Sequence, residues 1–551
     1  MRQLIAALAL ACAAGSAFAQ VSPKALSDDV KILASDAFEG RGPGSAAEPL
    51  TIDYLSKRLA GIGLQPAGDN GGWTQAVTLL HSRLGEGPIS VNGKPLTRNV
   101  DVYLSTQQPA DKVRFRSVPM VFVGYGVTAP ERGWDDFKDV DVRGKLVVML
   151  VNDPDFRAVE GEDAYGLFGG RRMTYYGRWS YKYEEAVRRG ALGALIIHDT
   201  EGAAYGWQTV IAPASENFDL ANGAGGPRLL AQGWMSDGFA RRLFADAGLD
   251  FEAQLKGARS KGFRPVDLKA RFSADLPVSQ EKVQSRNVLA KLPGTNRADE
   301  AILFGAHWDA FGIGPADAQG RTIRAGANDD ALGVAGLLEL ARLFKASGPT
   351  SRTLLFGFWT AEERLLLGSE YYARNPVVPM AKTVANYTLD VLNTGGPSHD
   401  VILVGDGQNE LEADLQAAAK AVGRRVTPDI LPERGLFYRA DHFSVAKRGV
   451  PTLLLMAMSG APDLVQGGRA AGDKWLQGYM ACYHQPCDNW NEGLDFRGAA
   501  EDVDLIFTIS RDLANSGRWP DWRDGSEFKD VRRQSRADDG AGDGAGGNQA
   551  R

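Results

Sequence analysis

Long apolar runs are missing from the sequence after its first nineteen residues. Nowhere beyond them do apolar residues reach the roughly 18 in succession that a membrane-spanning helix needs. Lys/Arg-rich runs are missing too, and 62 basic against 68 acidic residues give a net charge of −6, whereas nucleic-acid binding normally needs a basic face. We therefore expect no membrane span and no nucleic-acid partner. What is present, 44% hydrophobic and 24% charged residues over 551 positions, is typical of a soluble globular protein with more than one domain.

The amino terminus has the three regions of a secretory signal peptide. Arg2 is followed by an apolar run over residues 4–14 and then by Ala17-Phe18-Ala19. We expect cleavage before Gln20 and a periplasmic or secreted product. A lipoprotein acylated at Cys12 is the alternative, and it is disfavoured because Ala9 stands where a leucine is usual.

Cysteine is scarce, with three residues in the whole chain. Removal of the leader with Cys12 leaves Cys482 and Cys487, which are separated by four residues. In an oxidising compartment a local disulfide is the expected pairing, and it would fix the geometry around His484 inside its loop. Two thiolate metal ligands are the alternative.

The pattern of apolar residues changes along the chain and divides it into two parts. Residues 116–265 are rich in β-type runs, such as 118–123 and 145–151, whereas from residue 287 short apolar strands alternate with helices, as in an α/β sheet covered on both faces. We expect an α/β fold: a mixed, mostly parallel sheet sandwiched by helices, with an inserted β-rich domain. The expected parts are a leader (1–19), a first part of the α/β domain (20–115), the insertion (116–265), the α/β core (266–520) and a disordered tail (521–551) that ends in a Gly/Asp-rich stretch.

Histidine is also scarce, so the positions of the six histidines are informative. His307 closely follows the expected strand at 301–305, and in open α/β sheets reactive groups collect beyond the carboxyl ends of the strands. Asp309, two residues on, could hydrogen-bond the His307 ring and fix its tautomer, as partners of metal-binding imidazoles do. Alone, this pair indicates a structural histidine more readily than a site.

Further acidic residues follow the next expected strands and helices. Asp330 suits a helix N-cap, which leaves Asp329 spare, and the adjacent carboxylates Glu362 and Glu363 at the end of a buried strand need a cation nearby. Asp390 and His484 stand at two more such positions. Two histidines and three carboxylates suit two zinc ions that share one carboxylate and a water, and the remaining glutamate can serve as the base.

The motifs His-Glu-x-x-His and Gly-x-Ser-x-Gly and the P-loop are absent, which removes common competitors. What is present resembles the M28 family of dizinc metallopeptidases, and the resemblance covers roughly residues 28–515. The matching segments are Gly305-Ala306-His307-Trp308-Asp309, Asn328-Asp329-Asp330-Ala331-Leu332-Gly333, Ala361-Glu362-Glu363, Leu389-Asp390 and Tyr483-His484-Gln485-Pro486-Cys487-Asp488. The segment Arg439-Ala440-Asp441-His442-Phe443 is similar to the family's Ser-Asp-His segment, with Ala440 in place of serine.

The resemblance implies a role for each of these residues. His307 and Asp390 would bind one zinc, Glu363 and His484 the other, Asp329 would bridge both, and Glu362 would be the general base. Tyr483 would stabilise the oxyanion or simply pack. The β-rich block, through residues 121–126 and 144–148, resembles the protease-associated (PA) domain that some of these enzymes insert as a lid or substrate shelf.

The resemblance therefore predicts an exported dizinc exopeptidase that acts on peptide substrates, most simply an aminopeptidase. A glutamate-carboxypeptidase-like enzyme is the runner-up, with Arg171, Arg172 or Arg178 to receive a terminal carboxylate; a one-zinc glutaminyl cyclase fits less well because all five ligand positions are kept. A non-catalytic binding protein on the same scaffold is the alternative of another class. Side-chain preference and oligomeric state are not predicted.

Overall fold

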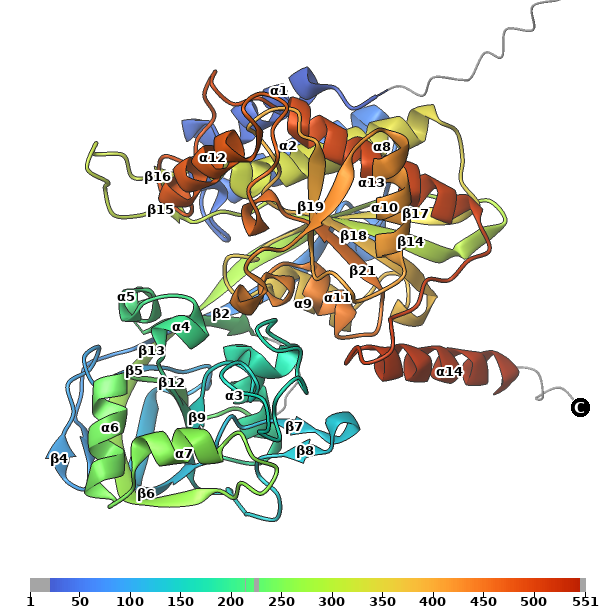
Figure 1. The fold of residues 1–551 in the computed structure, drawn as a ribbon. Helices are drawn as coiled ribbons and strands as arrows, with labels where there is room; N and C mark the ends of the chain where they lie inside the picture. Colours follow the sequence, from blue (N-terminus) through green and yellow to red (C-terminus); the bar gives the residue numbers. More distant parts are fainter. Residues whose placement is uncertain (1–19, 214, 222–226, 546–551) are drawn as a thin grey trace, which may run out of the picture.

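The structure is a computed structural model that describes residues 20–213, 215–221 and 227–545. A larger α/β domain and a smaller domain lie side by side (Figure 1). The predicted signal peptide lies outside the described residues. Within the described part, no helix is long and apolar enough to cross a membrane.

The larger domain is built on a mixed, mostly parallel sheet, as predicted. The central strands β14, β17, β18 and β21 run parallel to one another, β19 is antiparallel to β21, and β2 and β13 add an antiparallel side. Their bounds are β2 Thr74–Leu84, β13 Val266–Leu292, β14 Arg297–His307, β17 Arg352–Trp359, β18 Thr383–Leu389, β19 Asp400–Val404, β20 Arg425–Pro428 and β21 Thr452–Leu455.

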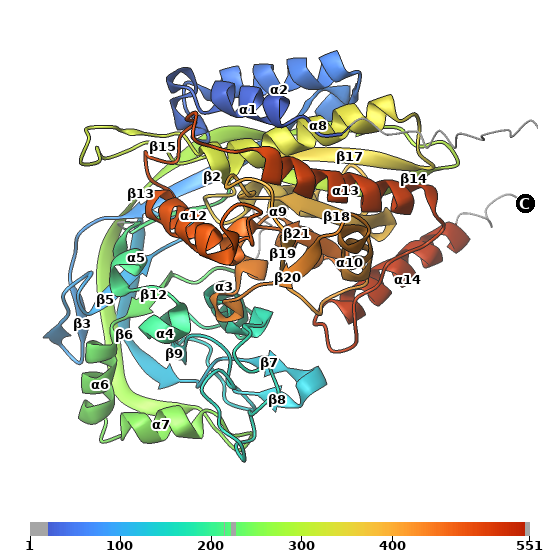
Figure 2. The ribbon, with the colours of Figure 1, turned by 45° about the horizontal axis from the view of Figure 1, so that its top comes forward.

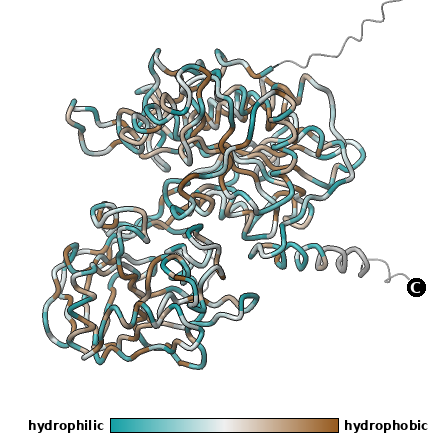
Figure 3. Tube along the Cα trace, viewed as in Figure 1, coloured by the Kyte–Doolittle hydropathy of each residue, from teal (hydrophilic) through white to brown (hydrophobic). Residues whose placement is uncertain are grey.

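Helices cover both faces of this sheet, which is why its central strands are apolar on both sides. In β14, Ile302 and Phe304 face the cluster formed with α1, α2, α8 and α13, while Leu303 faces the opposite cluster with α9 and α11. Figure 2 shows the first group stacked on one side of the sheet, and Figure 3 shows hydrophobic residues along the central strands. The bounds are α1 Pro23–Leu33, α2 Glu48–Ile62, α8 Leu332–Ala346, α9 Leu367–Arg374, α10 Leu411–Ala421, α11 His442–Ala446, α12 Gly468–Cys482 and α13 Arg497–Asn515.

The smaller domain has its own sheet, in which β6, β9, β10 and β12 are parallel neighbours, with β5 antiparallel to β12 at one end and β13 antiparallel to β6 at the other. Its elements are β3 Ile89–Val91, β4 Lys94–Pro95, β5 Val102–Ser105, β6 Lys112–Phe122, β7 Thr128–Ala129, β8 Trp134–Asp135, β9 Leu146–Leu150, β10 Gly193–Ile197, β12 Ala231–Met235, α3 Trp179–Arg188, α4 Thr200–Ala203, α5 Trp207–Ile211, α6 Asp237–Asp246 and α7 Phe251–Gly257. The short strands β1 Gln65–Pro66 and β11 Glu216–Leu220 pair with β13 and β2, and β15 Gly312–Ile313 pairs with β16 Ile323–Arg324.

The boundaries of the smaller domain differ from the expected 116–265. Its sheet already includes β3 and β5, and it extends into β13 as far as Pro277. The start of β6 alternates exposed and buried residues, so it lacks the continuous apolar run by which the other strands were predicted. The 27-residue strand β13 belongs to both sheets, pairing with β6 up to Pro277 and with β2 from Val278.

The carboxyl-terminal segment also differs from the expected disordered tail. Helix α14 spans Lys529–Ala545, and Trp522 and Phe528 are buried in a cluster with Phe437. Arg532, almost fully buried, donates hydrogen bonds to the carbonyl oxygens of Met380 and Thr383. The expectation rested on the Gly/Asp-rich end alone, whereas these three large side chains precede it and anchor the segment.

Candidate metal centre

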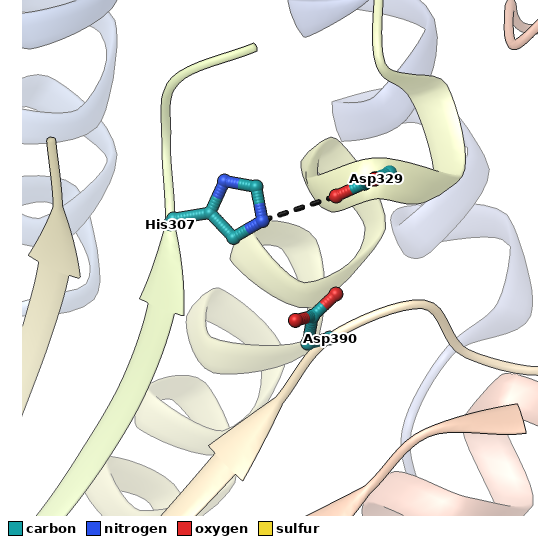
Figure 4. Close-up of side chains that lie close together, drawn as sticks. All are labelled: His307, Asp329 and Asp390. Carbon is teal, nitrogen blue, oxygen red and sulfur yellow. Dashed lines mark ion pairs between the residues drawn. The ribbon is translucent and has the colours of Figure 1, made fainter. Parts of the chain in front are cut away.

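The predicted site residues lie at the carboxyl edge of the large sheet. His307 is the last residue of β14, Glu362 and Glu363 follow β17, and Asp390 follows β18. Asp329 lies in the irregular turn between β16 and α8, where the peptide bond from Asp329 to Asp330 is cis. His484 comes from the loop after α12. In Figure 4 the His307 ring points at the Asp329 carboxylate, and Asp390 lies at the end of the neighbouring strand.

The five predicted ligands form two groups that share Asp329. The first holds His307, Asp329 and Asp390, the second Asp329, Glu363 and His484, and in each group one ligand atom per residue lies within 4.8 Å of the others. Asp329 Oδ1 is 3.1 Å from His307 Nε2, and its Oδ2 is 3.2 Å from His484 Nε2. These are the same two sets, with the same shared carboxylate, that the sequence resemblance implied.

The chemistry of the donors fits divalent metal ions such as zinc. Nε2 of His307 and Nε2 of His484 are buried, and although both lie close to Asp329, neither makes a well-directed hydrogen bond with any described residue. Each group offers one imidazole nitrogen and two carboxylates, a mixed set that zinc accepts. Buried polar atoms are normally satisfied, so two such nitrogens turned toward carboxylates indicate cation sites.

The electrostatics of the centre favour a cation as well. Burial raises the pKa of Glu362 and of Asp390 well above the usual range. Burial alone would lower the pKa of His307, but the surrounding carboxylates, Glu362 foremost, raise it well above its usual value. For His484, Glu363 and Asp329 likewise outweigh burial and raise the pKa to about 10. The protein thus concentrates negative charge that a divalent ion would neutralise.

Glu362 belongs to neither ligand group. Its Oε2 is 3.8 Å from His307 Nε2, and the residue is 9% exposed. Its backbone amide donates a hydrogen bond to Asp309 Oδ1, 3.0 Å away. A buried carboxylate beside the centre and outside the ligand sets is free to exchange a proton.

Asp309 contacts the His307 ring, as expected, but it does so through its backbone carbonyl oxygen. The ring's Nδ1 lies 3.0 Å from the Asp309 backbone carbonyl oxygen and 3.6 Å from Oδ1. An Nδ1–H that donates to a carbonyl leaves Nε2 as the ligand atom, so the tautomer is set by the main chain. The side chain is turned toward the Glu362 amide instead.

Two carboxylates hold the turn that carries Asp329. Asp488 accepts hydrogen bonds from the backbone amides of Asn328 (3.0 Å) and Asp329 (3.2 Å). The N-cap of α8 is Ala331 and not the expected Asp330, but Asp330 still accepts a hydrogen bond from Gly333 N in the first turn of the helix, and it accepts another from His307 N. The backbone amide of His307 is therefore bound to the same turn that carries Asp329.

Arg41 is a supporting residue that the sequence reasoning missed. It is fully buried, and its guanidinium donates to the carbonyl oxygens of four residues, Leu33 (2.8 Å), Trp308 (2.7 Å), Ala325 (2.6 Å) and Gly326 (2.8 Å). It thus joins the strand end after His307 to the segment before Asp329. In the sequence it stands in a glycine-rich run that indicates only a loop, so no periodicity marks it.

The loop that carries His484 is held by aromatic rings and a disulfide. The His484 ring lies between Tyr483 and Phe311, with ring centroids 3.6 and 4.3 Å away. Cys482 and Cys487 form a disulfide that closes the loop. His484 has a positive φ of 60°, which is unfavourable for a residue with a side chain, and the closed loop helps to hold it there.

Three of the other histidines make contacts with residues outside the two ligand groups. His81 stacks on Phe218, and His198 Nε2 contacts the carbonyl oxygen of Tyr205. His442 is buried against Phe437, and burial lowers its pKa to about 3, which keeps it neutral. Its neighbour Asp441 is buried, which raises the pKa of its carboxyl to about 7.

Comparison with known proteins identifies the segment that holds this centre. Residues 287–507 match the model of Peptidase family M28. This part of the chain, which includes the two ligand groups, is therefore similar to the peptidases of family M28.

Curated relatives match this chain over segments about as long as the segment that matches the family model. "Leupeptin-inactivating enzyme 1" of Streptomyces exfoliatus is 28% identical over 206 residues, 37% of this chain and 43% of the relative. "Probable lipoprotein aminopeptidase LpqL" of Mycobacterium tuberculosis is 30% identical over 172 residues, 31% of this chain and 30% of the relative. An "Aminopeptidase" of Pseudomonas aeruginosa is 26% identical over 220 residues, 38% of each chain. The chain spans less than half the length of these relatives.

A solved structure shares the overall fold. "Aminopeptidase from Aneurinibacillus sp. strain AM-1" superposes with a TM-score of 0.51 at 19% identity, covering 91% of this chain and 96% of that one. The match extends over both domains because it covers nearly the whole chain.

Proposed function

We propose that this protein is an exported dizinc aminopeptidase. The observation that carries the proposal is the pair of ligand groups that share Asp329, with Glu362 beside them and in neither. The relatives named as aminopeptidases support the choice of reaction. A non-catalytic binding protein would have no need of all five ligands and the base.

His307 and Asp390 would hold one zinc, Glu363 and His484 the other, and Asp329 both. When bound, the two ions would polarise the scissile carbonyl and lower the pKa of the attacking water. Glu362 takes a proton from this water as its oxygen bonds to the carbonyl carbon, and returns it to the leaving amine as the C–N bond breaks. The Asp309 carboxylate, through the Glu362 amide, holds the base in position for both transfers.

Tyr483 is proposed to stabilise the oxyanion. Burial raises the pKa of its hydroxyl well above 10, so the group stays protonated at neutral pH and can donate a hydrogen bond. Its ring contacts the His484 ring in a tilted arrangement, which places it next to the second ligand group.

The smaller domain is proposed to be a PA-like wall of the substrate site, and the protein to be periplasmic or secreted. The wall is supported by contact between the domains: Met173 N donates to the Pro432 carbonyl oxygen, and Tyr175 packs on Phe443. Export is supported by the signal-like leader and by the disulfide, which is typical of oxidising compartments.

The test is Glu362→Gln in the zinc-loaded protein. We expect kcat on peptides with a free amino terminus to fall by about 10²–10⁴-fold, while elemental analysis finds the metal content unchanged. Glu86→Gln, a change at a glutamate whose side chain is 91% exposed, is the matched control and keeps full activity. Near-normal turnover by Glu362→Gln would refute the assignment of the base, and cleavage of amino-blocked peptides from the carboxyl end would favour a carboxypeptidase.

A further inference from the structure

The two histidines of the candidate metal centre are held in different ways. Nδ1 of His307 lies 3.0 Å from the carbonyl oxygen of Asp309, so a hydrogen bond fixes the plane of this ring. His484 comes from a loop, and its Nδ1 makes no hydrogen bond with any described residue. Metal-binding imidazoles are normally oriented by a hydrogen bond at the other ring nitrogen. The orientation of the His484 ring therefore depends on its other contacts.

A row of contacts runs from His484 to the antiparallel side of the large sheet. The Phe311 ring lies against the His484 ring, with centroids 4.3 Å apart. The guanidinium of Arg364 lies over the rings of Phe311 and Phe218, 5.1 and 5.2 Å from their centroids. Phe218 in turn stacks on His81, with centroids 4.4 Å apart and ring planes within 6°. These five residues, which we call the contact row, link a proposed ligand to strands β11 and β2.

The outer end of the contact row is fixed in the sheet. Phe218 of β11 and His81 of β2 are direct partners in an antiparallel ladder. His81 is also the partner of Glu281 on β13, and its Nδ1 lies 2.9 Å from Glu281 Oε1. Partners across antiparallel strands are held close together by the ladder. The row therefore has one end anchored in the sheet and a ligand on a loop at the other.

Arg364 is the central member of the contact row, and it directly follows the proposed ligand Glu363. It is half-buried, and its side chain makes no hydrogen bond or ion pair with the described residues. A guanidinium is planar and weakly hydrated, so it is attracted to aromatic faces. The contacts of this cation with the described part of the protein are thus directed at the rings of Phe218 and Phe311.

We propose that Arg364 is a positioning residue for the second metal ion: it holds Phe311 against His484 and so fixes the ring of this ligand. The contact row does for His484 what the carbonyl oxygen of Asp309 does for His307. The inference rests on the proposed dizinc function and extends it to a residue outside both ligand groups. An imidazole whose ring is already oriented loses less freedom when it binds a metal, so the row should strengthen this site.

The test is the zinc affinity of each site, measured by titration with a chelator as competitor. Arg364→Met keeps a long side chain but removes the planar cation. We expect the site that contains His484 to bind zinc about 3- to 10-fold more weakly, the range of a cation–π contact, and the site of His307 and Asp390 to be unchanged. Arg364→Lys should restore part of the affinity, because it restores the charge without the flat guanidinium.

A second variant separates positioning from a general loss of stability. Phe218→Leu keeps an apolar side chain on β11 but removes the ring beneath Arg364, and it should weaken the same site. Because both changes break one row, the double variant should bind zinc about as weakly as Arg364→Met alone. Arg242→Met is the matched control: it removes a guanidinium that lies over Phe239 of the smaller domain, 5.7 Å from the centroid, and should leave both sites unchanged.

The orientation of the ring can also be measured without metal. In the metal-free protein labelled with ¹³C-histidine, the His484 signal is identified by its absence from a His484→Asn variant. The ring of Phe311 shifts this signal, so Arg364→Met should move it toward the position of an unstructured histidine while the His307 signal stays in place.

The outcomes separate this proposal from the proposed function. Equal weakening of both sites, additive losses in the double variant, or a His484 signal that Arg364→Met does not move would each overturn the proposal, even if the wild type binds two zinc ions and is active. A wild type that binds no zinc would refute the proposed function, and the His484 signal would still decide whether Arg364 fixes the ring.

Discussion

The carboxylate of Asp309 accepts a hydrogen bond from the backbone amide of Glu362, with Oδ1 and N 3.0 Å apart. Asp309 also presents its backbone carbonyl oxygen to the ring of His307. One fully buried residue therefore holds both a proposed metal ligand, through its main chain, and the proposed base, through its side chain.

Because these two contacts use different atoms, substitution of Asp309 should separate them. Asp309→Ala keeps the carbonyl contact and removes the side-chain acceptor, so we expect kcat to fall by about 10- to 100-fold with the metal content retained. Asp309→Asn keeps a side-chain oxygen as acceptor, so its kcat should fall less. Steady-state kinetics with elemental analysis measures both; loss of metal in Asp309→Ala with normal kcat after reloading would contradict this division.

Removal of the Arg41 guanidinium should weaken the fold and the metal centre together. Arg41→Met leaves four buried carbonyl oxygens without their donor, and we expect the free energy of unfolding to fall by about 3–5 kcal/mol. Denaturant titration measures the change. Arg497→Met, which breaks a surface pair with Asp495, is the control and should cost at most about 1 kcal/mol. Equally small losses of unfolding free energy in the two variants would show that the Arg41 guanidinium does not stabilise the fold in this way.

Metal binding should stabilise the protein more as pH rises. In the metal-free fold the pKa values of Asp390, Glu362, Glu363, His307 and His484 all lie above their usual values. The protonated forms of these groups stabilise the metal-free fold. This contribution is complete below the pKa values of the unfolded chain, about 4 for the carboxyls and 6.5 for the histidines, and it is lost as pH rises through the pKa values of the folded chain. The pKa of Asp329 is lowered instead, so its contribution to the stability of the fold is present at neutral pH and is lost only in acid.

Zinc competes with these protons, so the stabilisation of the fold by zinc increases as the protons are lost at higher pH. We expect the increase in Tm on adding zinc to be larger at about pH 7.5 than at about pH 5.5, and calorimetry to detect proton release on binding. A Glu363→Gln variant, which lacks one of these carboxylates, should show a smaller pH dependence. An increase in Tm that is the same at both pH values would contradict the site described here.

Opening the Cys482–Cys487 disulfide should affect the His484 half of the centre. The loop is so short that chain entropy contributes at most about 2 kcal/mol to stability, so global unfolding should change little. The double change to serine should instead weaken the metal site that contains His484 by about tenfold, leaving the site of His307 and Asp390 intact. Zinc titration with a chelator as competitor resolves the two; a uniform loss at both would contradict a local role for the disulfide.

Sequence reasoning selected residues that the structure brings together because each follows a recognisable strand or helix. His307, Glu363 and Asp390 stand just after apolar runs, and parallel strands bring such ends to one edge. Arg41 could not be found this way, since its partners are carbonyl oxygens, which every sequence supplies equally. The packing of Tyr175 on Phe443 also lay beyond sequence, because it depends on how two domains pack.

The misplaced domain boundary has a related cause. Strand β13 alternates exposed and buried residues over much of its length, and its two halves face different partners, so it presents no single apolar period. Residues such as Trp522 and Phe528 likewise belong to the core through distant contacts with Phe437, which local composition does not record.

Strand β13 has a mechanical consequence. The chain crosses from one sheet to the other between Pro277 and Val278 without leaving the strand, so no flexible linker intervenes at this crossing. Turning one domain against the other requires ladder hydrogen bonds to break or the strand itself to bend. Tyr175 of the smaller domain and Phe443 of the larger one, whose rings touch across the interface, are thereby kept in register, and a relative rotation of the domains is resisted by the strand as well as by this contact.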